Sequence, residues 1–131
     1  MIKERYCSFE VAKLLKEKGF DEPCVWAYDP NSVSFAKSYY EPKNSELNEY
    51  EYSKPTHQMA LDYLREEHNI LIWFSPVIPT PIPKDKTVFY WEWEAKKKLH
   101  SHPHVQSHIK HETFEEAVEA SLKYCLTELI K

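Results

Sequence analysis

The feature that most limits this chain of 131 residues is its single glycine, Gly19, beside nine prolines. Phosphate-binding loops, dinucleotide-binding fingerprints and the sharp turn that presents a nucleophilic serine each need two or more glycines. Their backbones adopt positive φ or approach a ligand closely, which only glycine does freely. The sequence therefore excludes these three kinds of site. Turns must be formed by Pro, Asn, Asp and Ser, which favours a stiff domain.

Length and composition fit one domain spanning residues 1–131. Hydrophobic residues make up 42% of the chain, and four Trp, nine Tyr and six Phe supply enough apolar area for a core. The net charge of −4 argues against a nucleic-acid partner, which requires a basic surface. Charged residues at the N-terminus and a longest apolar run of only residues 70–74 argue against a signal peptide and a membrane span. We therefore expect a cytoplasmic protein.

Three segments combine capping residues with the apolar spacing of helices, namely 9–18, 57–68 and 114–130. Gly19 follows the first segment and Asn69 the second, and both residues tolerate the left-handed conformation that ends a helix. Thr113 and Glu116 form a capping box before the third segment, in which each side chain would satisfy a backbone donor near the other residue. This third helix is predicted to bury Cys125.

Five segments have the alternation or the apolar character of strands, namely 24–28, 33–40, 70–74, 87–95 and 105–111. The first two are expected to form a hairpin. Residues 70–74 are apolar on both faces, which predicts a central strand or one covered on both sides. Trp91 and Trp93 share one face of their strand and are expected in the core. Residues 41–54 are interpreted as a loop, and the prolines from Pro76 to Pro83 as a stiff connection.

Together these segments predict an α+β domain. A mainly antiparallel sheet of about five strands would be covered by three helices, in the order helix, hairpin, helix, three strands, helix.

Three blocks of the sequence resemble a known family. They comprise residues 9–24, residues 55–60 with 64–66, and residues 113–120, which together cover the three predicted helices and less than half of the chain. They are similar to a family of small uncharacterised proteins from Bacteroides-type bacteria and their phages. The resemblance implies a bacterial or prophage-encoded cytosolic protein and carries no catalytic role with it.

A run of histidines is the candidate metal site. In an extended segment His100, His102 and His104 project to one face, where imidazoles could share a zinc, nickel or copper ion. Pro103 interrupts this segment, and histidine tracts bind divalent metals weakly even without a dedicated site. Beside the lysines at 96–98, the same histidines form a patch that gains positive charge below about pH 6.5. Apart from this weak metal site, no cofactor is expected.

Two other constellations would suit an enzyme. Cys24 at the start of a strand and His57 at the start of a helix could act as nucleophile and base. Glu92 and Glu94, about 7 Å apart on one strand face, could serve acid–base or metal chemistry. The alternative is that these residues have no catalytic role. Cys24 would then begin a buried strand, His57 would have one edge in solvent, and both glutamates would lie on the solvent-exposed face of a sheet. Three cysteines without CxxC spacing predict reduced thiols.

Tyr50 and Tyr52 are the candidate partner-binding residues. They lie in an acidic segment, and exposed tyrosines are typical of protein interfaces. Since no enzyme-like constellation outweighs its structural interpretation, we expect a non-enzymatic binding or interaction module, regulatory or self-associating. Its partner would be another protein or a second copy of the chain. The alternative is a metal-dependent or cysteine hydrolase acting on a small substrate.

Overall fold

The computed structural model of the chain describes residues 3–81, 84, 90–97, 105–107 and 109–130. In chain order the elements are α1 (Phe9–Glu17), β1 (Trp26–Tyr28), β2 (Ser34–Ala36), a 3₁₀ turn (Asn44–Glu46), β3 (Tyr52–Ser53), α2 (His57–His68), β4 (Ile70–Val77), β5 (Tyr90–Lys97), β6 (Val105–Gln106), α3 (Phe114–Tyr124) and a π-helical turn (Cys125–Leu129). The predicted α+β class is therefore confirmed.

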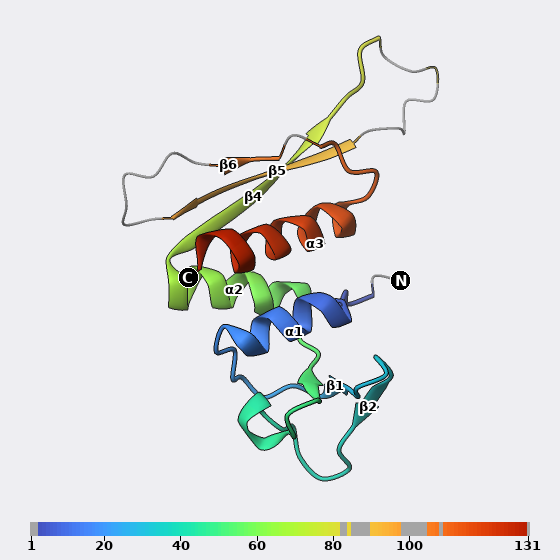
Figure 1. The fold of residues 1–131 in the computed structure, drawn as a ribbon. Helices are drawn as coiled ribbons and strands as arrows, with labels where there is room; N and C mark the ends of the chain where they lie inside the picture. The colour runs from blue at the N-terminus through green and yellow to red at the C-terminus, as the bar shows by residue number, and fades with distance from the viewer. Residues whose placement is uncertain (1–2, 82–83, 85–89, 98–104, 108, 131) are drawn as a thin grey trace.

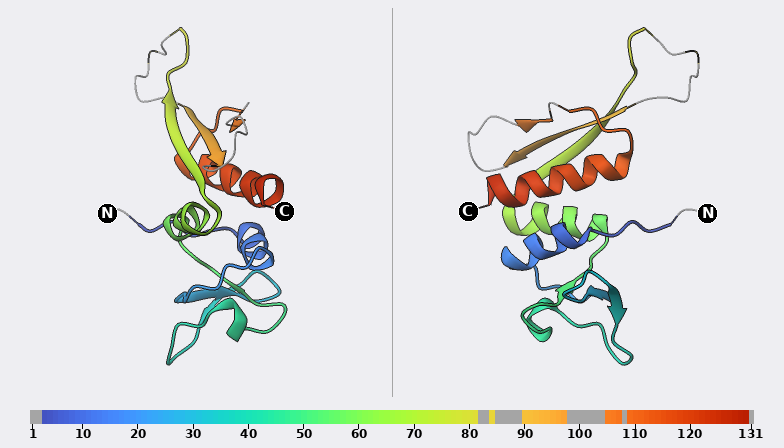
Figure 2. Two further views of the ribbon diagram at one scale, coloured as in Figure 1. Left: turned by 90° about the vertical axis from the view of Figure 1, so that its left-hand side faces the viewer. Right: turned by 45° about the vertical axis from the view of Figure 1, so that its right-hand side comes forward.

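The strands form two sheets, and the three helices lie in a layer between them (Figures 1 and 2). Both sheets are antiparallel, with the orders β2-β1-β3 and β4-β5-β6. The prediction of a single sheet is therefore wrong, whereas the predicted number of about five strands is close to the six strands of the described residues. Residues 41–54, interpreted as a loop, contribute β3, whose Ser53 and Tyr52 pair with Ala27 and Tyr28. The hairpin thus gains a third strand of its own. We call this β2-β1-β3 sheet the smaller sheet and the β4-β5-β6 sheet, which has the longer strands, the larger sheet.

The helices begin where their capping residues predict. The hydroxyl of Ser8 accepts a hydrogen bond from the backbone of Val11, and the Thr56 hydroxyl accepts one from Met59. Thr113 likewise accepts from the backbone of Glu116 at the start of α3. In each case a side-chain oxygen satisfies a donor that the first helical turn leaves free.

The end of α1 depends on the glycine. Gly19 has a φ of +93°, and the Phe20 N–H donates to the Leu15 carbonyl while the Gly19 N–H donates to that of Lys16. These two bonds define a Schellman ending, which folds Phe20 back into the core, where it is fully buried. At the end of α2, Asn69 is left-handed with a φ of +57°.

The third helix is less regular than predicted. Its α-helical part ends at Tyr124, and a π-helical turn continues to Leu129. The Thr127 hydroxyl contacts the carbonyls of Lys123 and Tyr124, where it competes for acceptors in the preceding turn. Cys125 is fully buried in this turn, as predicted.

The main core lies between the helices and the inner face of β4 and β5. Val118 and Leu122 of α3 are fully buried and belong to the same cluster as Trp93. The Trp93 ring lies 5.5 Å from that of Tyr124, and the half-buried Trp91 ring lies 5.1 Å from that of Phe114. Both tryptophans therefore belong to the core side, as predicted.

β4 differs from its prediction in place and in length. It pairs with β5 alone in its sheet and is an edge strand, not a central or doubly covered one. It also continues through Pro76 to Val77, beyond the end at Phe74 that the sequence predicts. Across the described residues, no helix is both long and apolar enough to cross a membrane.

Candidate functional site

An open groove of about 940 Å³ is lined by described residues. It lies where the segment before α1, the start of α2 and the face of α3 that carries Glu119 come together. The side chains that line it are Glu4, Arg5, Tyr6, Ser8, Phe9, Glu10, Ser32, His57, Glu115, Glu116, Glu119, Ala120 and Lys123. Four parts of the chain, including the turn at Ser32 between β1 and β2, thus share one concave surface, which we call the acidic groove.

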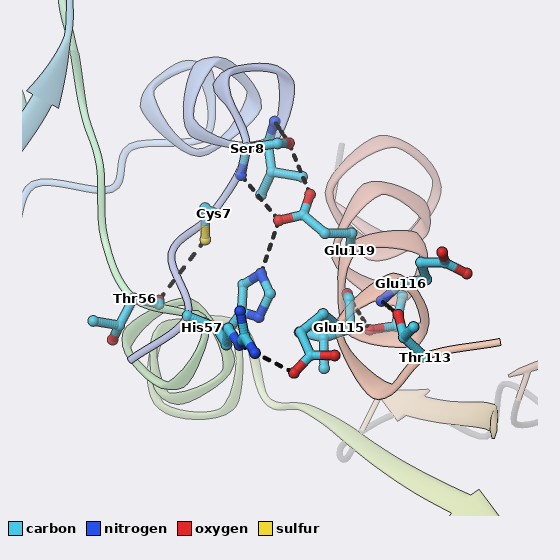
Figure 3. A network of polar contacts seen from close by, with 12 residues as sticks. Cys7, Ser8, Thr56, His57, Thr113, Glu115, Glu116 and Glu119 are labelled. Atoms are coloured by element: carbon cyan, nitrogen blue, oxygen red, sulfur yellow. Dashed lines mark hydrogen bonds and ion pairs between the residues drawn. The ribbon is translucent and has the colours of Figure 1, made fainter. Parts of the chain in front are cut away.

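Glu119 lines the acidic groove and links the three helices (Figure 3). Its Oε1 accepts the backbone N–H of Ser8 at 2.9 Å and lies 2.8 Å from Nε2 of His57. Its Oε2 accepts the Ser8 hydroxyl at 2.7 Å. The side chains of His57 and Glu119 are only 11% and 21% exposed, so water screens the pair weakly.

The network has a local cause in the sequence of α1. In a capping box the third helical residue is Glu or Gln and accepts the N–H of the N-cap residue. That position is Val11 here, which cannot accept. Glu119 of α3 supplies the missing carboxylate from a distant part of the chain, and its negative charge also lies at the positive end of the α1 dipole.

The contacts of Glu119 keep it ionised. Burial by itself would raise the pKa of this carboxyl, but hydrogen bonds from His57 and from the Ser8 hydroxyl and backbone outweigh it and lower the pKa. An ionised carboxylate only accepts hydrogen bonds, so Nε2 of His57 carries the shared hydrogen. The network is therefore a fixed negative charge held by three donors.

The same geometry argues against Ser8 as a nucleophile. A catalytic serine donates its proton to a histidine, which a carboxylate holds from the other side. Here the carboxylate lies between Ser8 and His57, and both donate to it. The Ser8 oxygen also accepts from the backbone of Val11. The trio positions helices and does not form a charge relay.

The charges along the acidic groove are unbalanced. Five glutamates line it against two permanent cations. Arg5 lies 3.2 Å from Glu115, and Lys123 lies 2.8 Å from Glu10, so both cations are already paired. Glu4 and Glu116 are exposed at the surface. The groove therefore presents a net negative charge to whatever enters it.

The proposed pair of Cys24 and His57 is not brought together by any contact among the described residues. His57 is bound to Glu119, and its ring is buried, so the expectation of an edge in solvent is wrong. The Cys24 thiol lies 3.6 Å from the Glu22 carbonyl, and burial raises its pKa to about 12 despite an opposing contribution from Ser53. A thiol that stays protonated at neutral pH is a poor nucleophile.

The other candidates have separate surroundings. His100, His102 and His104 lie outside the described residues, and within the described ones no group of three or more His, Cys, Asp or Glu could hold a metal ion. Glu92 and Glu94 are half-buried on the outer face of the larger sheet, where Glu94 accepts a hydrogen bond from Gln106.

The two candidate tyrosines have different roles. Tyr50 is 61% exposed and remains available to a partner. Tyr52 is half-buried, its ring meets that of Phe9 edge to face at 5.5 Å, and the Lys16 ammonium lies 5.3 Å from its centre. Tyr52 therefore holds the smaller sheet against α1, whereas Tyr50 does not take part in that packing.

Comparison with known proteins adds no relative: no family model, curated protein or solved structure matches the chain. The resemblance to proteins of Bacteroides-type bacteria and their phages stays a prediction.

Proposed function

We propose that the chain is a non-enzymatic binding module whose acidic groove takes a cationic segment of a partner protein. The observation that carries this proposal is the excess of glutamates over cations along one open concave surface. Charge complementarity selects partners and directs their approach, even where each exposed ion pair contributes little affinity.

The shape of the groove suits a chain segment better than an enclosed small molecule. Its volume of about 940 Å³ is near the upper limit for small-molecule pockets, and it is open to solvent. Phe9 and Tyr6 add ring surface beside the carboxylates, so the methylene stem and charged head of a Lys or Arg could both find contacts. The Glu119 network keeps the groove walls in place before binding.

The test is a titration of the protein with a short peptide of alternating Lys and Ala, followed by NMR. Shifts are expected at groove residues such as Tyr6 and Ala120, and they should weaken as salt is added. The double variant Glu4→Gln and Glu116→Gln should weaken binding by about two- to thirtyfold, since it removes two exposed carboxylates and each exposed ion pair contributes about 0.2–1 kcal/mol.

Two matched controls keep this test specific. A peptide of alternating Glu and Ala should cause no shifts at the groove. Glu17→Gln removes one negative charge, half of what the double variant removes, from an exposed site of α1 that does not line the groove, and it should bind the lysine peptide almost as wild type does. Equal loss of binding in Glu17→Gln and in the double variant would contradict the proposal.

A further inference from the structure

The outer edge of β4 carries the backbone groups that a further strand would need. The Trp91 N–H donates to the His111 carbonyl at 2.8 Å, and the His111 N–H donates back to the Trp91 carbonyl at 2.8 Å. Both polar groups of Trp91 therefore point away from β4. Trp91 stands opposite Pro76, so this pair is a non-hydrogen-bonded one in the antiparallel ladder.

Hydrogen-bonded and non-hydrogen-bonded pairs alternate along an antiparallel ladder, so the pair of Pro76 and Trp91 determines the direction in which the backbone groups of the other β4 residues point. Since Pro76 points its backbone away from β5, so do Phe74 and Ile72, while Leu71 and Ser75 point toward β5. No described residue binds the outward groups of Ile72 and Phe74. Pro76 has no backbone N–H, and its nitrogen lies on the outward side, so β4 contains this proline without losing a hydrogen bond to β5. The outward N–H groups of β4 are therefore those of residues before Pro76.

The composition of β4 is unusual for a free edge. Natural edge strands are protected by charged side chains, by bulges or by short length. β4 has eight residues, from Ile70 to Val77, and none is charged. Its only protection in the described structure is the proline near its end.

We propose that β4 pairs antiparallel with β4 of a second copy of this chain, forming one sheet that continues across a two-fold axis. A second copy fits because an uncharged strand placed antiparallel to itself brings no like charges opposite one another. The outward groups of Ile72 and Phe74 then bind their counterparts in the partner. No residue of β4 lines the acidic groove, so this interface and the groove use different residues.

Amide hydrogen exchange on the wild-type protein, over a dilution series, tests the pairing directly. At high protein concentration the amides of Ile72 and Phe74 should be protected, and dilution should release them. The amides of Leu71 and Ser75, which point toward β5, should stay protected at all concentrations. Sedimentation over the same series should show a change from twice the 15.7 kDa chain mass to the single chain.

The matched variants are Ile72→Pro and Ile72→Val. The first removes an outward N–H without removing a bond to β5, and dimerisation should weaken about tenfold or more because two symmetric interchain bonds are lost. The second keeps the N–H and should dimerise like wild type. A chain that is monomeric throughout, or a dimer in which the Ile72 and Phe74 amides exchange as in the monomer, would overturn the proposal. Should Ile72→Pro fail to fold, the exchange measurement on wild type decides alone.

Discussion

Glu119 shows how a single side chain can join three helices that the sequence keeps far apart. It accepts two hydrogen bonds from Ser8 and one from His57, and the pair with Ser8 spans 111 positions of the chain. Buried hydrogen bonds to a charged group stabilise more than neutral ones do, and a donor left without its partner is costly. Glu119 should therefore stabilise the fold as well as shape the acidic groove.

Replacing this carboxylate tests that role. Glu119→Gln should lower the free energy of unfolding by about 1–3 kcal/mol, because three donors lose a charged acceptor. Urea unfolding at pH 7 measures the change. Glu128→Gln, at an exposed position near the C-terminal end, should stay within about 0.5 kcal/mol of wild type. If the two variants lose the same free energy of unfolding, Glu119 does not stabilise the fold in this way.

The same residue predicts a pH dependence. The pKa of Glu119 is lowered below its ordinary value of 4.5, so its stabilisation is complete above that value and is lost as pH falls through the folded-state pKa. Unfolding free energies measured from pH 7 downward should differ most between wild type and Glu119→Gln above pH 4.5, and the two curves should converge in acid. A constant difference down to the lowest pH would contradict this assignment.

Local residue patterns were sufficient for the helix starts but not for this network. Ser8, Thr56 and Thr113 each cap a helix as predicted, because a cap involves residues only three positions apart. Glu119 has an ordinary place in a helical pattern, and nothing in its neighbours indicates contact with Ser8 or His57. One signal existed: α1 has a serine cap and no acceptor at Val11, so its capping box was incomplete.

Among the elements, the end of α1 depends most on one residue type. Gly19→Ala should destabilise the fold by about 1–2 kcal/mol, since its φ of +93° is strained for a residue with a Cβ. A new Cβ would lie 3.7 Å from the Tyr63 hydroxyl, an ordinary contact, so the cost comes from the backbone and not from a clash. Thermal unfolding compares it with Lys18→Ala, whose φ is −95°. Similar losses in both variants would contradict this cause.

The strands were harder to predict than the helices because their partners decide their place. The apolar run that opens β4 indicated burial on both sides, yet the strand lies at an edge, where helices cover one face. The sequence also predicts that this strand ends before Pro76. A proline is tolerated in this strand because its nitrogen faces away from β5. The pairing of Trp91 with His111 determines that direction. β3 has only two residues, and its short alternation could not be told from a loop.

The two sheets are attached to the rest of the molecule in different ways. The larger sheet shares the main core with the helices, whereas the strands of the smaller sheet contribute no residue to that cluster. The smaller sheet is attached by ring contacts from Phe9 to Tyr28 and Tyr52, and by the Tyr28 hydroxyl, which donates to the Cys7 carbonyl at 2.6 Å. Elements with few core contacts open at lower free energy than the rest.

Native-state hydrogen exchange in low urea should therefore show the β1 amides opening before those of α3. Tyr28→Phe, which leaves the Cys7 carbonyl without its donor, should lower both opening free energies by about 1 kcal/mol. Val118→Ala, at a buried position of α3, should lower the opening free energy of α3 by about 2 kcal/mol. The opening free energy of β1 should stay unchanged in this variant, because the core stays folded when only the smaller sheet opens. If both variants shift β1 and α3 together, the molecule unfolds as one unit and the two sheets are not separable.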